Sequence, residues 1–173
     1  MACATHTTKQ KFQGVTTVTF QVSTLSQKDF VMIQISDTHL LETPEVEFLG
    51  MHPEQSFHAV VDLVRQQHHE IDVIVHTGDL AQNPTTVTYQ RYLHYMQSLG
   101  VPFFQTPGNH DNPALFPFHE ADPSQPTVFQ LGQWCIILLN SAQTERIDGK
   151  IAAAQLQQLT ELLTQYHDRH MLI

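Results

Sequence analysis

The sequence predicts an α/β fold in which strands and helices alternate. Three short apolar runs, at residues 30–35, 71–76 and 101–105, are typical of buried strands. Between them lie two stretches with apolar residues at helical spacing, residues 54–69 and 83–99. The order strand, helix, strand, helix, strand implies a parallel sheet with right-handed crossovers.

The segments around this unit differ in character. Residues 1–14 are polar and are expected to form a disordered tail, so the folded domain is predicted to comprise residues 15–173. Residues 15–22 alternate apolar side chains with threonines, which is typical of an edge strand. A loop rich in Glu and Pro, residues 41–53, is placed to shape the mouth of a substrate site.

Local signals predict the faces and ends of the first two helices. Asn83 and Pro84 suit the N-cap and N1 positions of the second helix, and Gly100 suits the position after its end. The side chains expected to face the core are Phe57, Val60, Val61 and Val64 in the first helix, and Tyr89, Leu93 and Met96 in the second.

After the third strand, the sequence predicts a hairpin, a last helix and the opening of a further strand. The hairpin joins residues 127–130 to residues 134–140, and the final strand opens at residues 170–173. An unpaired edge near that strand leaves pairing with a second copy, and hence a homodimer, open. The helix at residues 152–167 is expected to bury Leu156, Leu159, Leu163 and Tyr166.

Residues able to bind metal ions follow each predicted parallel strand. Asp37 and His39 follow the first strand, Asp79 the second, and Asn109 and His110 the third. In an extended strand, side chains at i and i+2 point to the same side, so Asp37 and His39 can grip one cation. Ligands of parallel sheets bind beyond the carboxyl ends of the strands, where all five residues fall.

Carboxylate, imidazole and amide suit a pair of divalent ions. Asp79 can bridge two ions with its two oxygens, and Asn109 can hold the second ion without adding negative charge. In two-metal hydrolases, ions roughly 3.5–4 Å apart clamp a phosphoryl group and activate a water molecule. His110 is placed to contact the phosphoryl oxygens or the leaving oxygen, while Asp111 either orients it or caps the short helix that follows.

Less specific interpretations of these residues remain open. Asp37 and Asp79 could serve as caps of turns or helices, and His39 could be a loop histidine without a role. Residues 107–109 are Pro, Gly and Asn, which are typical of a turn without any metal site. Any one motif alone is weak evidence, whereas three in this order point to a metal centre.

The motifs Asp-x-His, Gly-Asp and Gly-Asn-His-Asp resemble the calcineurin-like metallophosphoesterase family. The strings ISDTHL, VHTGDLAQ, PGNHD and QWCIILLNS, with the pair Tyr89-Gln90, are similar to bacterial class III cyclic-nucleotide phosphodiesterases, from about residue 30 to the C-terminus. The resemblance implies a β-sandwich flanked by helices. It also implies hydrolysis of a small phosphodiester, 3',5'-cyclic AMP, through a metal-bridging hydroxide.

Site roles follow from the same resemblance. It implies that Asp37, His39 and Asp79 hold one divalent ion, and that Asp79 and Asn109 hold the other. His110 is then catalytic and, with Asn109, binds the substrate. Manganese, iron, zinc and magnesium all suit these ligand types.

Two motifs of the family pattern, a lone histidine and Gly-His-x-His, do not occur after these residues. We therefore expect an N-terminal portion whose C-terminal part is missing, and a site that binds metal weakly. The alternative is an inactive or weakly active remnant that acts as an interaction module. A phosphomonoesterase, pyrophosphatase or nuclease of the same superfamily also shares the motifs.

Composition narrows the class of partner and the location. The 173 residues, 41% hydrophobic, predict one globular domain, and a formal charge of −9 argues against a nucleic acid polymer. We find no signal-peptide pattern and no apolar run of membrane-spanning length. Cys135 falls in an apolar strand and Cys3 in the polar tail, which favours a reducing cytoplasm.

Overall fold

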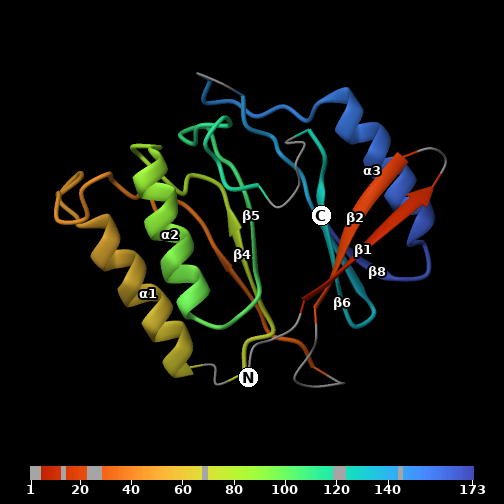
Figure 1. The fold of residues 1–173 in the computed structure, drawn as a ribbon, viewed down its shortest axis with the longest axis horizontal. Helices are drawn as coiled ribbons and strands as arrows, with labels where there is room; N and C mark the ends of the chain where they lie inside the picture. Colours follow the sequence, from red (N-terminus) through yellow and green to blue (C-terminus); the bar gives the residue numbers. More distant parts are fainter. Residues whose placement is uncertain (1–4, 13–14, 23–28, 68–69, 119–123, 144–145) are drawn as a thin grey trace.

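The chain folds into four layers, in the order helices, sheet, sheet, helix (Figure 1). A computed structural model describes residues 5–12, 15–22, 29–67, 70–118, 124–143 and 146–173. The first sheet contains β3 (Met32–Ile35), β4 (Val73–Thr77) and β5 (Phe103–Thr106). The second contains, in spatial order, β1 (Thr5–Phe12), β2 (Val15–Val22), β6 (Thr127–Leu131), β7 (Trp134–Leu138) and β8 (His170–Leu172). The helices are α1 (Pro53–Gln67), α2 (Thr86–Ser98) and α3 (Ala153–Gln165).

Among the described residues, three apolar clusters hold the layers together. The first joins α1 and α2 to the three-stranded sheet, and the third joins α3 to β6 and β7. Between the sheets, the rings of Phe104 and Phe129 stack in parallel with centroids 4.2 Å apart. This arrangement confirms the expected α/β sandwich flanked by helices.

The strands of the first sheet end at one common edge. β3 pairs with β4 in parallel, and β4 pairs with β5 in parallel, as the alternation of strands and helices predicted. Ile35 is the register partner of His76, and Thr77 is the partner of Thr106. The three loops that carry the predicted site residues therefore leave the sheet side by side.

The predicted tail and edge strand need correction. Thr5–Phe12 form β1, which pairs along its whole length with β2, although residues 1–14 were expected to be disordered. The backbone N–H and C=O groups of this polar segment form hydrogen bonds with β2. Such pairing does not require apolar side chains, so a hydrophobicity pattern does not predict it. β2 consequently lies between β1 and β6 rather than at an edge. Residues 1–4 and 13–14 lie outside the described residues.

Three details of the helices also differ from the prediction. Val60 of α1, which was expected to face the core, is 50% exposed. The N-cap of α2 is Thr85, whose Oγ1 accepts a hydrogen bond from the Thr88 amide, instead of Asn83. Gly100 follows the helix with a φ of 66°, as predicted. In α3, Leu162 is buried whereas Leu156 is half exposed, so the inward face is rotated from the expected one. The buried side chains of this face are Gln155, Leu162 and Tyr166.

Candidate metal centre

Backbone hydrogen bonds fasten the loop after β3 to the loop after β4. In each of three bonds, an amide of the first loop donates to a carbonyl of the second. The two loops therefore run alongside each other over these three bonds. The pairs are Asp37 to Gly78 at 3.1 Å, His39 to Asp79 at 3.0 Å and Leu40 to Leu80 at 2.9 Å. Because Leu40 and Leu80 are fully buried, the core anchors both loops.

Three predicted ligands adopt left-handed backbone conformations. The φ angles are 55° at Asp37, 44° at His39 and 52° at Asp79. Such values are uncommon outside glycine, cost about 1–3 kcal/mol each and concentrate at functional sites. The extended-strand argument for Asp37 and His39 was therefore wrong in its geometry, since the strand ends at Ile35.

The side chains nevertheless converge. The His39 Nε2 atom lies 3.7 Å from Asp37 Oδ1 and 4.0 Å from Asp79 Oδ2. The His39 and His110 rings meet edge to face, with centroids 5.1 Å apart. One ligand atom from each of His39, Asp79 and His110 lies within 4.8 Å of the other two, so these three could hold one ion. His110, which was predicted to be catalytic, thus lies close enough to His39 and Asp79 to be a metal ligand as well.

A further polar side chain orients His39. The His39 Nδ1 atom lies 3.1 Å from the amide oxygen of Gln82. An amide oxygen only accepts hydrogen bonds, so Nδ1 carries the proton and the Nε2 lone pair faces the two carboxylates. Metal-binding histidines commonly donate their other ring N–H in this way. Sequence analysis did not single out Gln82, although it is the last residue of the string VHTGDLAQ that carries the family resemblance.

The loop after β5 closes on Asp79. A Cβ atom at Gly108 would lie only 2.2 Å from Asp79 Oδ1, so the close approach requires glycine at this position. The backbone amide of His110 donates to Asp79 Oδ1 at 2.9 Å. Asn109, which lies between Gly108 and His110 in this loop, is half buried. All five predicted site residues are therefore gathered at one end of the three-stranded sheet.

Asp111 is buried beneath the loops and stabilises them. Its carboxylate accepts hydrogen bonds from the amides of Gly108, Leu80 and Ala81, at 2.9–3.1 Å, and from the Tyr89 hydroxyl. Burial raises the pKa of Asp111, and these four donors oppose that rise. Asp111 was expected to orient His110 or to cap the following helix, and it instead binds these loop amides. In the following turn, the Asn112 side chain accepts from the Ala114 amide.

A second buried network reaches the residue between the first two ligands. His76 Nδ1 lies 3.1 Å from the Tyr92 hydroxyl, and His76 Nε2 lies 3.5 Å from Thr38 Oγ1. The Thr38 hydroxyl donates to the Leu80 carbonyl at 3.0 Å. Thr38 Oγ1 can then accept from His76 Nε2–H, which leaves Nδ1 to accept from Tyr92. Burial lowers the pKa of His76 to about 3, so the ring is neutral.

The centre borders a cavity between the two sheets. This cavity, of about 380 Å³, is lined by Asp37 and Asp79 on one side and by Leu139, Ser141 and Ile173 on the other. Thr106 links the two sides, since its hydroxyl donates to the Leu139 carbonyl at 3.1 Å. The candidate ligands are thus accessible to a small molecule at the end of the sandwich.

Comparison with known families agrees with this geometry. The family model for calcineurin-like phosphoesterases matches residues 30–167, which include all three ligand loops. The chain belongs to the calcineurin-like phosphoesterase family. The expected family resemblance is therefore confirmed, and membership in this family implies divalent metal ions, for which His39, Asp79 and His110 form a possible binding group.

Curated relatives carry more specific names. The chain is 35% identical over 145 residues to the 3',5'-cyclic adenosine monophosphate phosphodiesterase CpdA of Escherichia coli K12, covering 82% of this chain and 53% of the relative. It is 34% identical over 128 residues to a 3',5'-cyclic-nucleotide phosphodiesterase of Nostoc sp., covering 73% of this chain and 48% of the relative. The chain thus spans about half the length of these relatives, as expected for an N-terminal portion.

Proposed function

We propose that this chain forms the metal-binding part of a phosphodiesterase that hydrolyses a small cyclic nucleotide, 3',5'-cyclic AMP. The observation that carries the proposal is the position of the His39 Nε2 atom between the carboxylates of Asp37 and Asp79, with His110 beside it. The names of the relatives support the substrate class.

The donor set suits divalent ions, and we propose that it holds two. Asp37, His39 and Asp79 would hold one ion, and Asp79 and Asn109 would hold the other. The fit rests on the free Nε2 lone pair of His39, which the hydrogen bond to Gln82 maintains, and on a second Asp79 oxygen that is directed to His39. When bound, such ions supply positive charge for a phosphoryl group and lower the pKa of a water molecule. Manganese, iron, zinc or magnesium could serve.

His110 would act on the leaving group. Its ring is exposed at the end of the sandwich, while its backbone amide is fixed to Asp79. A protonated imidazole there can donate its proton to the leaving oxygen as the P–O bond breaks, which neutralises the developing alkoxide. Asn109, the residue before it, would help to bind the phosphoryl oxygens.

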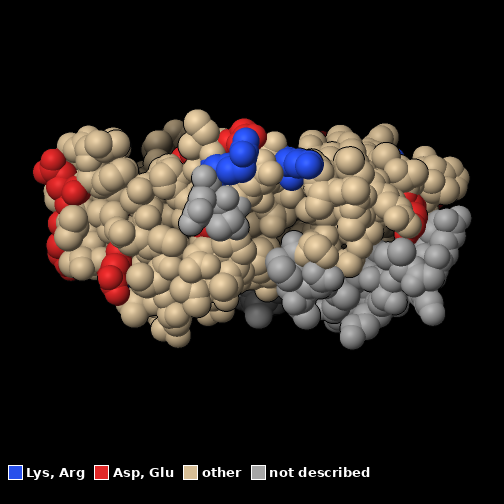
Figure 2. Space-filling view, turned by 90° about the horizontal axis from the view of Figure 1, so that it is seen from above, with Lys and Arg blue, Asp and Glu red and all other residues tan. Residues whose placement is uncertain are grey.

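A small substrate suits the surface better than a polymer. The formal charge is −9, and on the face seen in Figure 2, outside its grey residues, Lys and Arg side chains are sparse. Nucleic acid polymers require an extended basic surface.

Within the described parts of the chain, no helix combines the length and the apolar character that crossing a bilayer requires. We propose that the protein acts in the cytoplasm, and that pairing through β8 could form a homodimer.

The test combines metal binding with complementation. Manganese titrated into this chain should bind at one dominant site that Asp79→Ala abolishes. Cyclic AMP hydrolysis should be near background for residues 1–173. It should rise when the chain is fused to the part of the Escherichia coli relative that it does not match. A fusion that binds manganese but hydrolyses no cyclic AMP would overturn the proposed reaction.

The second candidate is a remnant that serves as an interaction module. The observation that favours it is that apolar clusters, which contain none of the proposed metal ligands, hold the layers of the fold together. A structural role predicts that the fold persists in Asp79→Ala and that no phosphodiester is hydrolysed by the chain or by its fusion. Metal-dependent turnover that Asp79→Ala removes would exclude it.

A further inference from the structure

A second cavity lies directly beside the candidate metal centre. Its volume is about 400 Å³, within the range of about 300–1,000 Å³ typical of small-molecule sites. The walls come from the end of β3, from the hairpin at residues 48–51 and from the first turns of α1. Asp37 and His39 form part of the wall, so this cavity and the metal centre are continuous.

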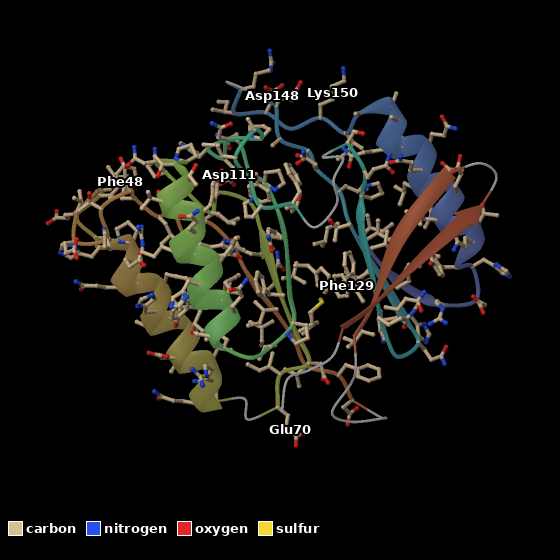
Figure 3. All side chains as sticks on the ribbon, viewed as in Figure 1. Phe48, Glu70, Asp111, Phe129, Asp148 and Lys150 are labelled. Atoms are coloured by element: carbon tan, nitrogen blue, oxygen red, sulfur yellow. The ribbon has the colours of Figure 1, made fainter. Side chains whose placement is uncertain are left out.

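The hairpin gives the cavity a defined rim. Phe48 and Met51 exchange two backbone hydrogen bonds, at 2.7 and 3.0 Å. Between them, Leu49 and Gly50 have φ angles of 51° and 80°, the left-handed pair of a tight two-residue turn. The Phe48 ring lies 6.5 Å from the His39 ring, measured between centroids. Figure 3 shows Phe48 at the same upper end of the molecule as Asp111.

Several apolar side chains of this rim are exposed to solvent. The exposed fractions are 87% for Leu49, 58% for Met51 and 50% for Val60 of α1. Adjacent exposed apolar groups beside a polar site commonly mark a ligand surface. Among the described residues that line the cavity there is no lysine or arginine, and Asp37 is its only carboxylate. The cavity is therefore unsuited to an anion and suited to an uncharged group with apolar surface.

We propose that this cavity binds the nucleoside part of the substrate, with the base between Phe48 and Val60. The inference rests on the proposed function, which puts the phosphoryl group at the adjoining metal centre. A base has apolar faces and polar edges. Its faces match the side chains of Leu49, Phe48 and Val60, while the hydroxyls of Ser36 and Ser56 in the same wall can bind its edges or the ribose.

Adenosine is the probe that separates this cavity from the metal centre, because it carries no phosphate. We expect adenosine to bind this chain without added metal, measured by NMR titration. Val60→Ser should weaken binding about tenfold, the effect of removing an apolar contact from a specific pocket. Leu63→Ser is the matched control, since Leu63 lies on the same helix, is 52% exposed and is outside the cavity wall.

Each outcome tests the nucleoside site separately from the proposed hydrolysis of cyclic AMP. Binding that Val60→Ser and Leu49→Ser weaken, and that Leu63→Ser leaves unchanged, supports the nucleoside site even if the fusion hydrolyses nothing. Hydrolysis of cyclic AMP without saturable adenosine binding would overturn the nucleoside site and leave the reaction standing. Self-association that Leu49→Ser abolishes, with no adenosine binding, would overturn it in favour of a contact between copies.

Discussion

The Tyr89 hydroxyl donates a 2.9 Å hydrogen bond to the buried Asp111 carboxylate, directly beneath the ligand loops. The same hydroxyl accepts from the Asn112 amide at 3.0 Å. Tyr89 thus connects α2 to the loop after β5, while Asp111 connects that loop to the one after β4. This buried polar contact therefore joins the loops that carry the proposed metal ligands and contains no proposed ligand itself.

The first prediction compares the two partners. Tyr89→Phe should lower the free energy of unfolding by about 1–2 kcal/mol, because it removes one hydroxyl and keeps the ring. Asp111→Ala should cost about 3 kcal/mol or more, because it leaves two buried amides and one half-buried amide without their acceptor. Urea denaturation measures both losses. Equal losses would mean that the three amide contacts of the carboxylate add nothing to its contact with the tyrosine hydroxyl.

The second prediction concerns pH and His76. Its pKa falls from an ordinary 6.5 to about 3 on folding, so the neutral ring is favoured in the folded state. The stability that this group contributes is present above about pH 6.5 and is lost as the pH falls toward about 3. The wild-type slope in this window should include about 1.4 kcal/mol per pH unit from this group.

Two variants check the assignment to His76. Substituting His76→Gln should flatten the dependence between about pH 6.5 and about pH 3, while His167→Gln, at an exposed site, should leave it unchanged. The measurement is the free energy of unfolding across that window. An unchanged slope in His76→Gln would show that other groups govern acid unfolding.

The third prediction separates the two ion positions. Asp79 is proposed to contact both ions and Asn109 only one. Asp79→Ala should therefore lose all bound manganese, whereas Asn109→Ala should lose only part of it, measured by calorimetry. The control is Asp148→Ala, an exposed carboxylate paired with Arg146. Equal losses at Asp79 and Asn109 would count against the bridging role.

The fourth prediction concerns Gln82. Gln82→Ala should weaken manganese binding about 10–100-fold, because His39 loses the partner that holds its Nε2 atom toward the carboxylates. Gln82→Glu should restore binding, since a carboxylate also accepts from Nδ1–H. Gln143→Ala is the matched control in an exposed loop. If Gln82→Ala retains full affinity, the ring of His39 is oriented by packing alone.

Periodicity and residue type were sufficient for the framework of the fold. The three parallel strands and the residues at their carboxyl ends were predictable, because apolar runs define strands and the chemistry of Asp37, His39 and Asp79 is local. The roles of Gln82 and His76 were not predictable, since their partners lie 43 and 16 residues away in the sequence.

Two misjudged features have physical reasons. Hydrophobic patterns carry no information on φ, so the left-handed conformations of Asp37 and His39 could not be foreseen. In α3, leucines occur on more than one side of the helix, and only packing against β6 and β7 selects Leu162 over Leu156 for burial.

The last prediction tests whether His110 is catalytic, a ligand or both. In the fusion with the unmatched part of the Escherichia coli relative, a purely catalytic His110 predicts that His110→Ala lowers kcat by roughly 10²–10⁴-fold with metal content unchanged. A ligand role, which its closeness to His39 and Asp79 allows, predicts that metal is lost as well. His94→Ala, an exposed histidine on α2, is the control for general effects of the substitution. Metal content measured beside kcat therefore distinguishes the roles, and unchanged turnover in His110→Ala would exclude both.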